Sequence, residues 1–208
     1  MLHIERFINQ LMSSNCYLVV DEESGHCLCI DPASEKSENE IKYISDRGLL
    51  LDYIFLTHEH IDHTWGVNAL LEAFPLAKLV CSEHCIGSFP QDAKVFFQLF
   101  YNVANYEYDI KRIDYTTEIL GGELKWHGHE VEFISTPGHS PGSMCIAIDG
   151  VIFGGDTLML FKPFINKRRG GSKELYAESV TKIKQRFAPN TMVYPGHGEP
   201  FELHEMKL

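Results

Sequence analysis

The sequence has no long hydrophobic run. Although 44% of its 208 residues are hydrophobic, no apolar stretch approaches the roughly 18 residues that a membrane-spanning helix requires. The first ten residues include Glu5 and contain no apolar core, so they do not resemble a secretory signal peptide. We therefore expect a soluble, globular, cytoplasmic protein that does not bind membranes.

Positive charge is also scarce. Lys and Arg number 18 against 29 Asp and Glu, which gives a formal net charge of −11. A general nucleic-acid-binding protein needs a basic face, so we expect no nucleic-acid partner. The expected partner is a small-molecule substrate. An anionic one remains compatible with this composition if a local basic patch receives it.

No pair of cysteines has the C-x-x-C spacing of many metal and redox sites, although there are six cysteines. In a reducing compartment such residues are expected to be free and to pack as small buried hydrophobic side chains. A metal-binding role for Cys27 and Cys29 is the less favoured alternative.

Strand-like and helix-like segments alternate along the chain. Period-two or continuous apolar patterns predict strands at residues 16–21, 27–31, 52–57, 77–81, 130–136, 144–148, 151–153 and 191–194. Helical periodicity predicts helices at residues 38–47, 66–74 and 174–187. This alternation favours a layered α/β fold over a sandwich of sheets alone. We expect residues 1–208 to form a single domain.

One short stretch, THEHIDH, dominates the chemistry of the sequence. It follows an apolar strand, and residues two apart on an extended chain point the same way, so His58 and His60 can bind one ion together. Asp62 and His63 come where the chain should turn into a helix beginning near Thr64, and they can hold a second ion nearby. Imidazole and carboxylate ligands suit zinc, iron or manganese.

Three later strands end in further candidate ligands. His139 lies in the loop PGHSPGS, Asp156 follows a Gly-Gly pair, and His197 lies in PGHG. Together with the first motif they supply seven ligands, enough for two ions that share a bridging carboxylate. Asp31, before a proline, is either an outer partner that orients a metal-bound histidine or an ordinary turn residue.

The order of these motifs resembles the metallo-β-lactamase-fold hydrolase superfamily, nearest its glyoxalase II-like (hydroxyacylglutathione hydrolase-like) branch. The matching segments run from Asn15 to Pro200 and read NCYLVV, CLCIDP, THEHIDH, TPGHSPGS, GGDTL and YPGHGEP. The resemblance implies a four-layer αββα sandwich with the metal cleft at one edge of the two sheets.

By position, the resemblance also implies a binuclear metal centre with seven ligands. The first metal would be held by His58, His60 and His139, the second by Asp62, His63 and His197, and Asp156 would bridge them. The cofactors would be two divalent ions, zinc first, with iron or manganese as alternatives. A metal-bridging hydroxide would attack the carbonyl of a small ester or thioester. Asp62 would be the catalytic residue that receives a proton.

Departures from the relatives restrict the substrate. Asp156 stands where the best-known β-lactamase subclass carries a metal-binding cysteine, so a β-lactam is not expected. The quorum-signal lactonases carry a tyrosine shortly after the bridging aspartate, and residues 157–160 contain none, so a lactone signal is a less favoured substrate. The chain ends soon after His197, so we expect no C-terminal helical domain of the kind that glutathione thioesterases use to bind substrate.

Two segments have open interpretations. Lys167, Arg168 and Arg169 form the only dense basic cluster in the sequence, which is either an anion clamp for the substrate or a solvated loop. An aromatic-rich insert covers about residues 84–118. Within it one helical face carries Phe96, Leu99, Phe100 and Val103. Packing of this face against the core is favoured, and a lid over a pocket or a homodimer face is the alternative.

Two other classes of function remain beside the hydrolase. The first is a persulfide dioxygenase-like oxidoreductase with one iron, held by the residues that match His58, His60, His139 and Asp156. The second is a non-catalytic metal-binding protein. The remaining histidines have no comparable setting, and His127 and His129 are expected in a turn.

Overall fold

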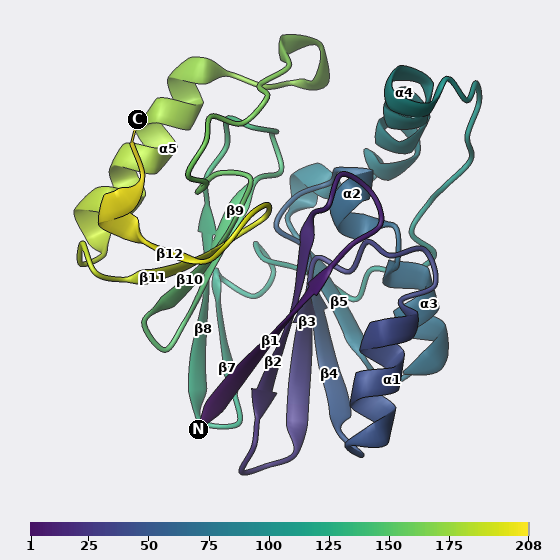
Figure 1. Ribbon diagram of the computed structural model, residues 1–208, viewed down its shortest axis with the longest axis vertical. Coiled ribbons are helices and arrows are strands. Elements are labelled where there is room, and N and C mark those ends of the chain that lie inside the picture. Colours follow the sequence, from purple (N-terminus) through teal and green to yellow (C-terminus); the bar gives the residue numbers. More distant parts are fainter. Residues whose placement is uncertain (208) are drawn as a thin grey trace.

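Two six-stranded sheets lie face to face in the computed structural model, which describes residues 1–207 except for the side chain of Arg168 (Figure 1). The first sheet contains, in spatial order, β1 (Leu2–Ile8), β2 (Asn15–Asp21), β3 (His26–Ile30), β4 (Leu50–Phe55), β5 (Lys78–Cys81) and β6 (Tyr115–Thr116). The first three strands are antiparallel and the last three continue in parallel. The carboxyl ends of β3, β4 and β5 therefore meet at one edge.

The second sheet is formed by the second half of the chain. Its strands are, in spatial order, β12 (Phe201–Glu202), β11 (Met192–Pro195), β10 (Val151–Gly155), β9 (Met144–Ile148), β8 (His129–Ser135) and β7 (Glu123–Trp126). Only β10 and β11 pair in parallel. The carboxyl ends of these two strands lie side by side, as those of β3 to β5 do in the first sheet.

Helices cover both outer faces of the pair of sheets (Figure 1). The helices are α1 (Glu38–Asp46), α2 (Ile61–Thr64), α3 (Val67–Ala73), α4 (Phe89–Tyr101) and α5 (Lys173–Arg186). Three single-turn 3₁₀ segments are η1 (Glu83–Cys85), η2 (Lys167–Arg169) and η3 (Leu203–Glu205). Helices α1 and α3 lie beside the first sheet and α5 lies beside the second.

The buried apolar side chains form a layer at each of the three interfaces between these elements. Between the sheets, side chains such as Leu28, Phe55 and Phe133 pack together, and the last two rings meet edge to face at 5.1 Å. A second cluster joins the first sheet to α1 and α3, and a third joins the second sheet to α5. The predicted αββα sandwich is confirmed.

Most predicted elements lie within one or two residues of the observed ones, but the helix after the histidine motif was placed wrongly. It begins at Ile61 rather than near Thr64, and a separate helix, α3, follows it. The early start depends on a residue distant in sequence, because the side chain of Asp92 accepts a hydrogen bond of 2.8 Å from the Ile61 backbone N–H. Asp62 and His63 therefore lie on the first turn of α2.

Several expectations about burial can be compared with the fold. All six cysteines are buried and free, as predicted. On the aromatic face, Phe96 is buried, but Leu99, Phe100 and Val103 are 60%, 48% and 42% exposed, so full packing of this face against the core is wrong. Among residues 1–207, no helix is long and apolar enough to cross a membrane.

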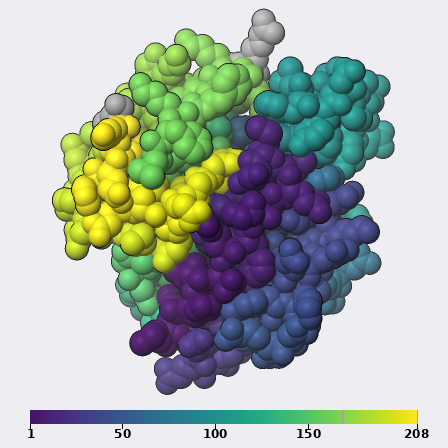
Figure 2. Space-filling model, viewed as in Figure 1, coloured from purple at the N-terminus to yellow at the C-terminus, as the bar shows by residue number. Residues whose placement is uncertain are grey.

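The loop between β1 and β2 meets the loop after β11 next to the carboxyl ends of the second sheet. On the face shown in Figure 2, the C-terminal segment lies against the loop between β1 and β2. The backbone N–H of Asn15 donates to the carbonyl of Gly196 over 2.7 Å, and Ser14 forms an isolated bridge with His197. This contact fixes the loop that carries His197.

Candidate metal centre

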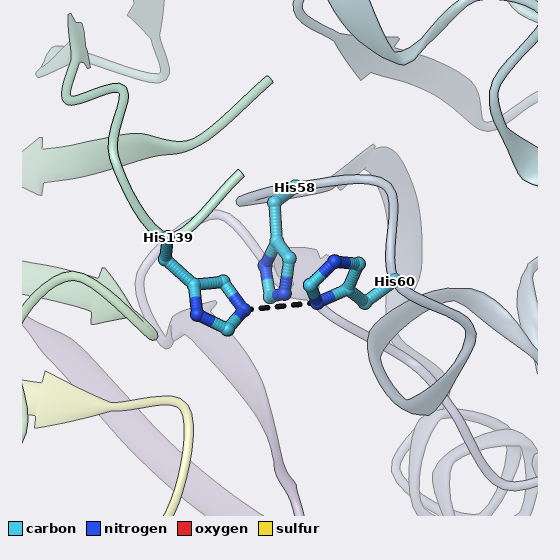
Figure 3. Close-up of side chains that lie close together, drawn as sticks. All are labelled: His58, His60 and His139. Carbon is cyan, nitrogen blue, oxygen red and sulfur yellow. Dashed lines mark hydrogen bonds between the residues drawn. The ribbon is translucent and has the colours of Figure 1, made fainter. Parts of the chain in front are cut away.

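His58, His60 and His139 form a first triad whose ligand nitrogens all lie within 4.8 Å of one another. The first two follow β4 and the third follows β8, so this triad spans the two sheets. Their rings converge in Figure 3, with His139 Nε2 only 2.9 Å from His60 Nδ1. The resemblance implied this trio as ligands of one metal, and the fold brings all three together.

Hydrogen bonds fix which nitrogen of His58 is available. The Thr57 hydroxyl donates to Asp31 Oδ2 over 2.6 Å, so its oxygen can accept from His58 Nδ1, which lies 3.0 Å away. The other nitrogen, His58 Nε2, is buried and has no hydrogen-bond partner among the described residues. A buried lone pair without a partner is costly, and a metal ion would satisfy it.

Asp62, His63 and His197 form a second triad beside the first. Their ligand atoms also lie within 4.8 Å of one another. The Oδ2 atom of Asp62 is 3.9 Å from His63 Nε2 and 3.6 Å from His197 Nε2. Helix α2 supplies the first two residues and the loop after β11 supplies the third. This grouping matches the second set of ligands that the resemblance implied.

Asp31 lies behind the second triad and orients His63. Its Oδ2 accepts a hydrogen bond of 2.9 Å from His63 Nδ1, and its Oδ1 accepts one of 2.8 Å from the Thr57 backbone N–H. This leaves His63 Nε2 buried and without a hydrogen-bond partner among residues 1–207. Of the two interpretations of Asp31, the structure supports the outer partner of a histidine.

Asp156 lies between the two triads. Its Oδ2 is 3.3 Å from His139 Nε2 in the first triad. Its Oδ1 is 3.4 Å from His63 Nε2 and 3.6 Å from His197 Nε2 in the second. One carboxylate oxygen therefore faces each set, which is the arrangement expected of a bridging ligand.

The electrostatics of the site follow from burial and from these contacts. Burial, and then the neighbouring histidines, hold the pKa of His58 and His60 well below the usual value, so both rings are neutral and can act as ligands. Burial would also lower the pKa of His63, but the carboxylates of Asp156 and Asp31 raise it well above the usual value. The adjacent histidines hold the pKa of Asp156 well below the usual value despite its burial.

The donor set fits a pair of borderline divalent cations. Imidazole nitrogens and carboxylate oxygens are the common ligands of zinc and related first-row ions. The buried nitrogens His58 Nε2 and His63 Nε2 and the oxygen Asp156 Oδ1 have no hydrogen-bond partner in the described part of the chain. Bound cations would therefore satisfy several buried polar groups at once.

Two acidic residues that the sequence did not single out hold the ligand loops in place. Glu59 lies inside the histidine motif and is buried, and its carboxylate accepts a hydrogen bond of 2.8 Å from Ser140, the neighbour of His139. Asp92 on α4 caps α2 and also pairs with Arg169. Their burial depends on contacts between segments that are distant in sequence. The local pattern of apolar and polar residues therefore could not predict it.

The loop of His197 is held by Asn15 and Tyr17 from β2. The Asn15 amide donates to the carbonyls of Pro195 and Gly198 over 2.9 and 2.8 Å, and the Tyr17 hydroxyl donates to Pro195 over 2.7 Å. A Cβ atom at Gly196 would lie 2.3 Å from Asp156 Oδ1. Glycine is therefore required where this loop passes the bridging carboxylate.

A cavity of about 280 Å³ opens directly on both triads. The ligands His60, Asp62, His139, Asp156 and His197 line it. Its other walls are mostly apolar, with Met12, Phe96, Phe100, Met159, Phe161, Pro163, Phe164, Asn166 and Arg169. The cavity is thus a small, largely apolar pocket with a ligand-rich floor.

The three residues of the basic cluster, Lys167 to Arg169, differ in their relation to this cavity. Arg169 lines the cavity wall, and its guanidinium donates to the Asp92 carboxylate. Burial lowers the pKa of Arg169. Lys167 is exposed, and the side chain of Arg168 lies outside the part of the chain that the structure describes. Of the three predicted contacts, the structure thus places Arg169 at the site.

An αββα sandwich with histidines and aspartates gathered at the strand ends of both sheets defines a class of metal-dependent hydrolases. The chain belongs to the Metallo-beta-lactamase superfamily, whose pattern it matches over residues 10–197. It is a metal-binding hydrolase of that superfamily, and the resemblance inferred from the motifs is confirmed.

Relatives with curated descriptions include hydrolases of two kinds. A probable polyketide biosynthesis zinc-dependent hydrolase, BaeB of Bacillus velezensis, is 31% identical over 94% of this chain and 78% of its own length. A hydroxyacylglutathione hydrolase of Aeromonas salmonicida is 31% identical over 87% of this chain and 60% of its own length. This chain therefore matches only part of the second relative.

Solved structures share the fold at lower identity. The BLEG-1 B3 metallo-beta-lactamase superposes with a TM-score of 0.84 at 21% identity, covering 98% of this chain and 95% of that one. ETHE1 from Myxococcus xanthus superposes with a TM-score of 0.74 at 22% identity, covering 98% and 80%. At this level of identity the similarity establishes the fold and not the substrate.

Proposed function

We propose that this protein hydrolyses a small ester or thioester at a centre of two divalent metal ions. The observation that supports this most directly is the position of Asp156, whose two carboxylate oxygens face different triads at 3.3 to 3.6 Å. A shared carboxylate is the feature that a binuclear centre needs and a single-metal centre does not. Zinc is the favoured metal, and iron and manganese are the alternatives.

The proposed reaction assigns the chain's own residues to binding and orientation. When bound, a pair of such ions lowers the pKa of a water between them and polarises a substrate carbonyl. His58 and His60 are held neutral by burial, so they are ready to bind without first losing a proton. Asp31 and Thr57 fix the rings of His63 and His58 so that their free nitrogens face the centre.

Asp62 is the proposed proton acceptor. It lines the cavity, and its Oδ2 lies 3.6 Å from His197 Nε2. Because Asp62 lines the cavity, a substrate bound there would lie within reach of its carboxylate. This carboxylate can therefore hold the proton released when water adds and pass it to the leaving group.

The cavity walls favour a substrate with an apolar acyl group. Phe100 is 48% exposed, Phe161 is 54% exposed and Phe164 is 71% exposed, and all three line the opening. Such aromatic side chains in water gain free energy when an apolar chain covers them. An acyl thioester or ester of moderate size fits this surface better than a highly charged substrate.

For the basic cluster we propose that Arg169 contacts substrate from the cavity wall. Its partner Asp92 already neutralises much of its charge, so we expect a modest effect. Arg169→Gln should raise the KM for an anionic thioester several-fold and leave the KM for its neutral analogue unchanged. Lys167→Gln, a change at an exposed position, is the matched control. Equal KM changes for both substrates would argue against an anion contact.

Metal analysis followed by a substrate panel tests the proposal. Purified protein should contain about two metal ions per chain before any metal is added, and it should hydrolyse thioesters or esters in a panel. His197→Ala removes a ligand of the second triad only, so it should lose one ion and at least about 100-fold in kcat/KM. His204→Ala, at an exposed position, should behave as wild type.

The variant His197→Ala also distinguishes hydrolysis from a second candidate function, that of a persulfide dioxygenase-like oxidoreductase with one iron. We retain this candidate because the chain shares its fold with ETHE1. A single iron per chain, oxygen consumption with a persulfide and full activity of His197→Ala would support it over hydrolysis. Metal binding with no turnover on either panel would instead favour a non-catalytic metal-binding protein.

A further inference from the structure

A second cluster of ligand side chains lies far from the centre described above. His26, Asp52 and His127 each offer a ligand atom, and these three atoms lie within 4.8 Å of one another. Asp52 is at the start of β4, whereas His58 follows the end of the same strand. The cluster is therefore at the opposite end of the sandwich, where the β7–β8 turn lies (Figure 1).

The three side chains converge closely. His26 Nδ1 is 2.9 Å from both carboxylate oxygens of Asp52, and His127 Nε2 is 2.9 Å from Asp52 Oδ2. The two imidazole rings lie together with centroids 4.0 Å apart. Trp126 Nε1 donates to the same carboxylate over 2.7 Å, as an outer hydrogen bond that orients a metal-binding carboxylate would.

An irregularity in the sheet places Asp52. In the pairing of β3 with β4, Cys27 is opposite Leu51 and the next residue, Leu28, is opposite Tyr53. Asp52 is thus the extra residue of a β-bulge, and such bulges redirect a side chain away from the regular alternation. Its carboxylate contacts His26, the first residue of the neighbouring strand β3.

The other histidine comes from the second sheet. His127 and Gly128 form the two-residue turn between β7 and β8, with φ of +46° and +90°. Positive φ at both positions suits asparagine and glycine, and a histidine there is uncommon. The turn therefore carries an imidazole at some conformational cost and directs it across to Asp52 in the first sheet.

We propose that His26, Asp52 and His127 form a separate binding site for a divalent first-row transition metal, zinc first, which links the two sheets. Binding uses the lone pairs of His26 Nδ1 and His127 Nε2, so each neutral ring would carry its proton on its other nitrogen, and the ion would replace the two contacts of these rings with Asp52. The Trp126 hydrogen bond remains and supports the carboxylate.

The surroundings are consistent with an accessible three-ligand site. The side chains of His26, Asp52 and His127 are 24%, 25% and 34% exposed. They lie at the rim of a surface cavity of about 670 Å³. Two imidazoles and a carboxylate leave a coordination position for water or for a small ligand in that cavity.

Zinc loading of matched variants tests this site. Chelator-treated protein is loaded with excess Zn²⁺, desalted and analysed for zinc per chain. His127→Asn keeps a residue that suits the turn, and Asp52→Asn removes the carboxylate without changing its shape. Both should bind one zinc fewer than wild type. His129→Asn is the control, because His129 is on the same hairpin but pairs with Asp149.

Thermal unfolding gives a second measure. The increase in Tm on zinc addition should be smaller in His127→Asn and Asp52→Asn than in wild type and His129→Asn, because a link between the sheets is lost. The same zinc content in all four proteins would overturn the proposal. An equal loss in His129→Asn would also overturn it, because zinc would then be binding to surface histidines in general.

Discussion

At the scale of single residues, the quality of the metal ligands depends on their hydrogen-bond partners. Asp31 accepts from Thr57 and from His63, and Thr57 in turn lies against His58. One carboxylate therefore sets the ring orientation of one histidine in each triad. The φ of Asp31 is +55°, a conformation that asparagine adopts as readily as aspartate.

Asp31→Asn should weaken zinc binding by about 10- to 100-fold while leaving the fold intact. The amide cannot accept both hydrogen bonds as the carboxylate does, so the His63 ring is less firmly held. Competition with a chromophoric chelator measures the affinity. Asp149→Asn is the matched control, because Asp149 also has a positive φ, of +46°, but lies at the exposed β9–β10 turn. Equal affinities in the two variants would exclude the orienting role of Asp31.

Glu40 on α1 is an acidic residue buried without any evident catalytic reason. It is 1% exposed, and neither carboxylate oxygen has a hydrogen-bond partner among residues 1–207. Burial raises its pKa above the usual 4.5. The folded protein therefore binds this proton more tightly than the unfolded chain, and stability falls as pH rises through the raised pKa.

Glu40→Gln should stabilise the protein relative to wild type at pH 8, because the amide is never charged, whereas the buried Glu40 carboxyl must either ionise in an apolar site or stay protonated there. The gain should shrink toward pH 4, where wild-type Glu40 is protonated. Urea denaturation at both pH values measures it. Glu38→Gln, on the exposed side of the same helix, should show little pH-dependent difference. A constant effect of Glu40→Gln across pH would contradict this account.

At the scale of elements, α4 combines buried and exposed side chains, in part on the same face. Phe96 and Phe97 are buried against the core, whereas Leu99 and Phe100 are exposed. Phe96 and Phe100 both line the cavity over the metal centre. One turn of helix thus carries a packing residue and a residue at the cavity mouth.

Matched substitutions on α4 should separate these roles. Phe96→Ala should destabilise the protein by about 3–5 kcal/mol, since it leaves a cavity in the core. Phe100→Ala should change stability by less than about 1 kcal/mol but raise the KM for an acyl thioester several-fold. Thermal unfolding and steady-state kinetics distinguish the two. A large stability loss in Phe100→Ala would show that this face packs instead of contacting substrate.

At the scale of the whole molecule, the candidate centre joins the two sheets. His58, His60, Asp62 and His63 follow β4 of the first sheet, whereas His139, Asp156 and His197 follow strands of the second. Each triad takes ligands from both sheets. Bound metal would therefore stabilise the sandwich against separation of its halves.

Removal of metal by a chelator should lower the Tm by about 5–10 °C. A ligand present at about 100 times its Kd contributes about 2.7 kcal/mol to stability, and each kcal/mol shifts the Tm of a chain of this size by about 2–4 °C. Readdition of zinc should restore the Tm. In Asp156→Ala the chelator should have a much smaller effect. A Tm that is unaffected by chelation of the wild type would mean that metal does not hold the sheets together.

Much of the fold and of the ligand set could be predicted because the signals are local. Strands such as Asn15–Asp21 and Met144–Ile148 are continuous apolar runs bounded by turn residues, and the candidate ligands follow strands at short, fixed distances. The start of α2 was missed because Asp92, distant in sequence, caps it. The inward packing of Phe100 was wrong because helical periodicity shows which residues share a face and not what covers that face.

The sequence by itself therefore determined a layered α/β fold and the residues available as ligands, because strand periodicity and ligand spacing are properties of neighbouring residues. The αββα sandwich followed from the resemblance of the motifs to a known superfamily. Only the tertiary structure decided how these residues act together. The position of Asp156 between the triads, the support of His63 by Asp31 and the meeting of His26, Asp52 and His127 all join distant segments. Such contacts are fixed by the packing of one sheet on the other, which no local pattern encodes.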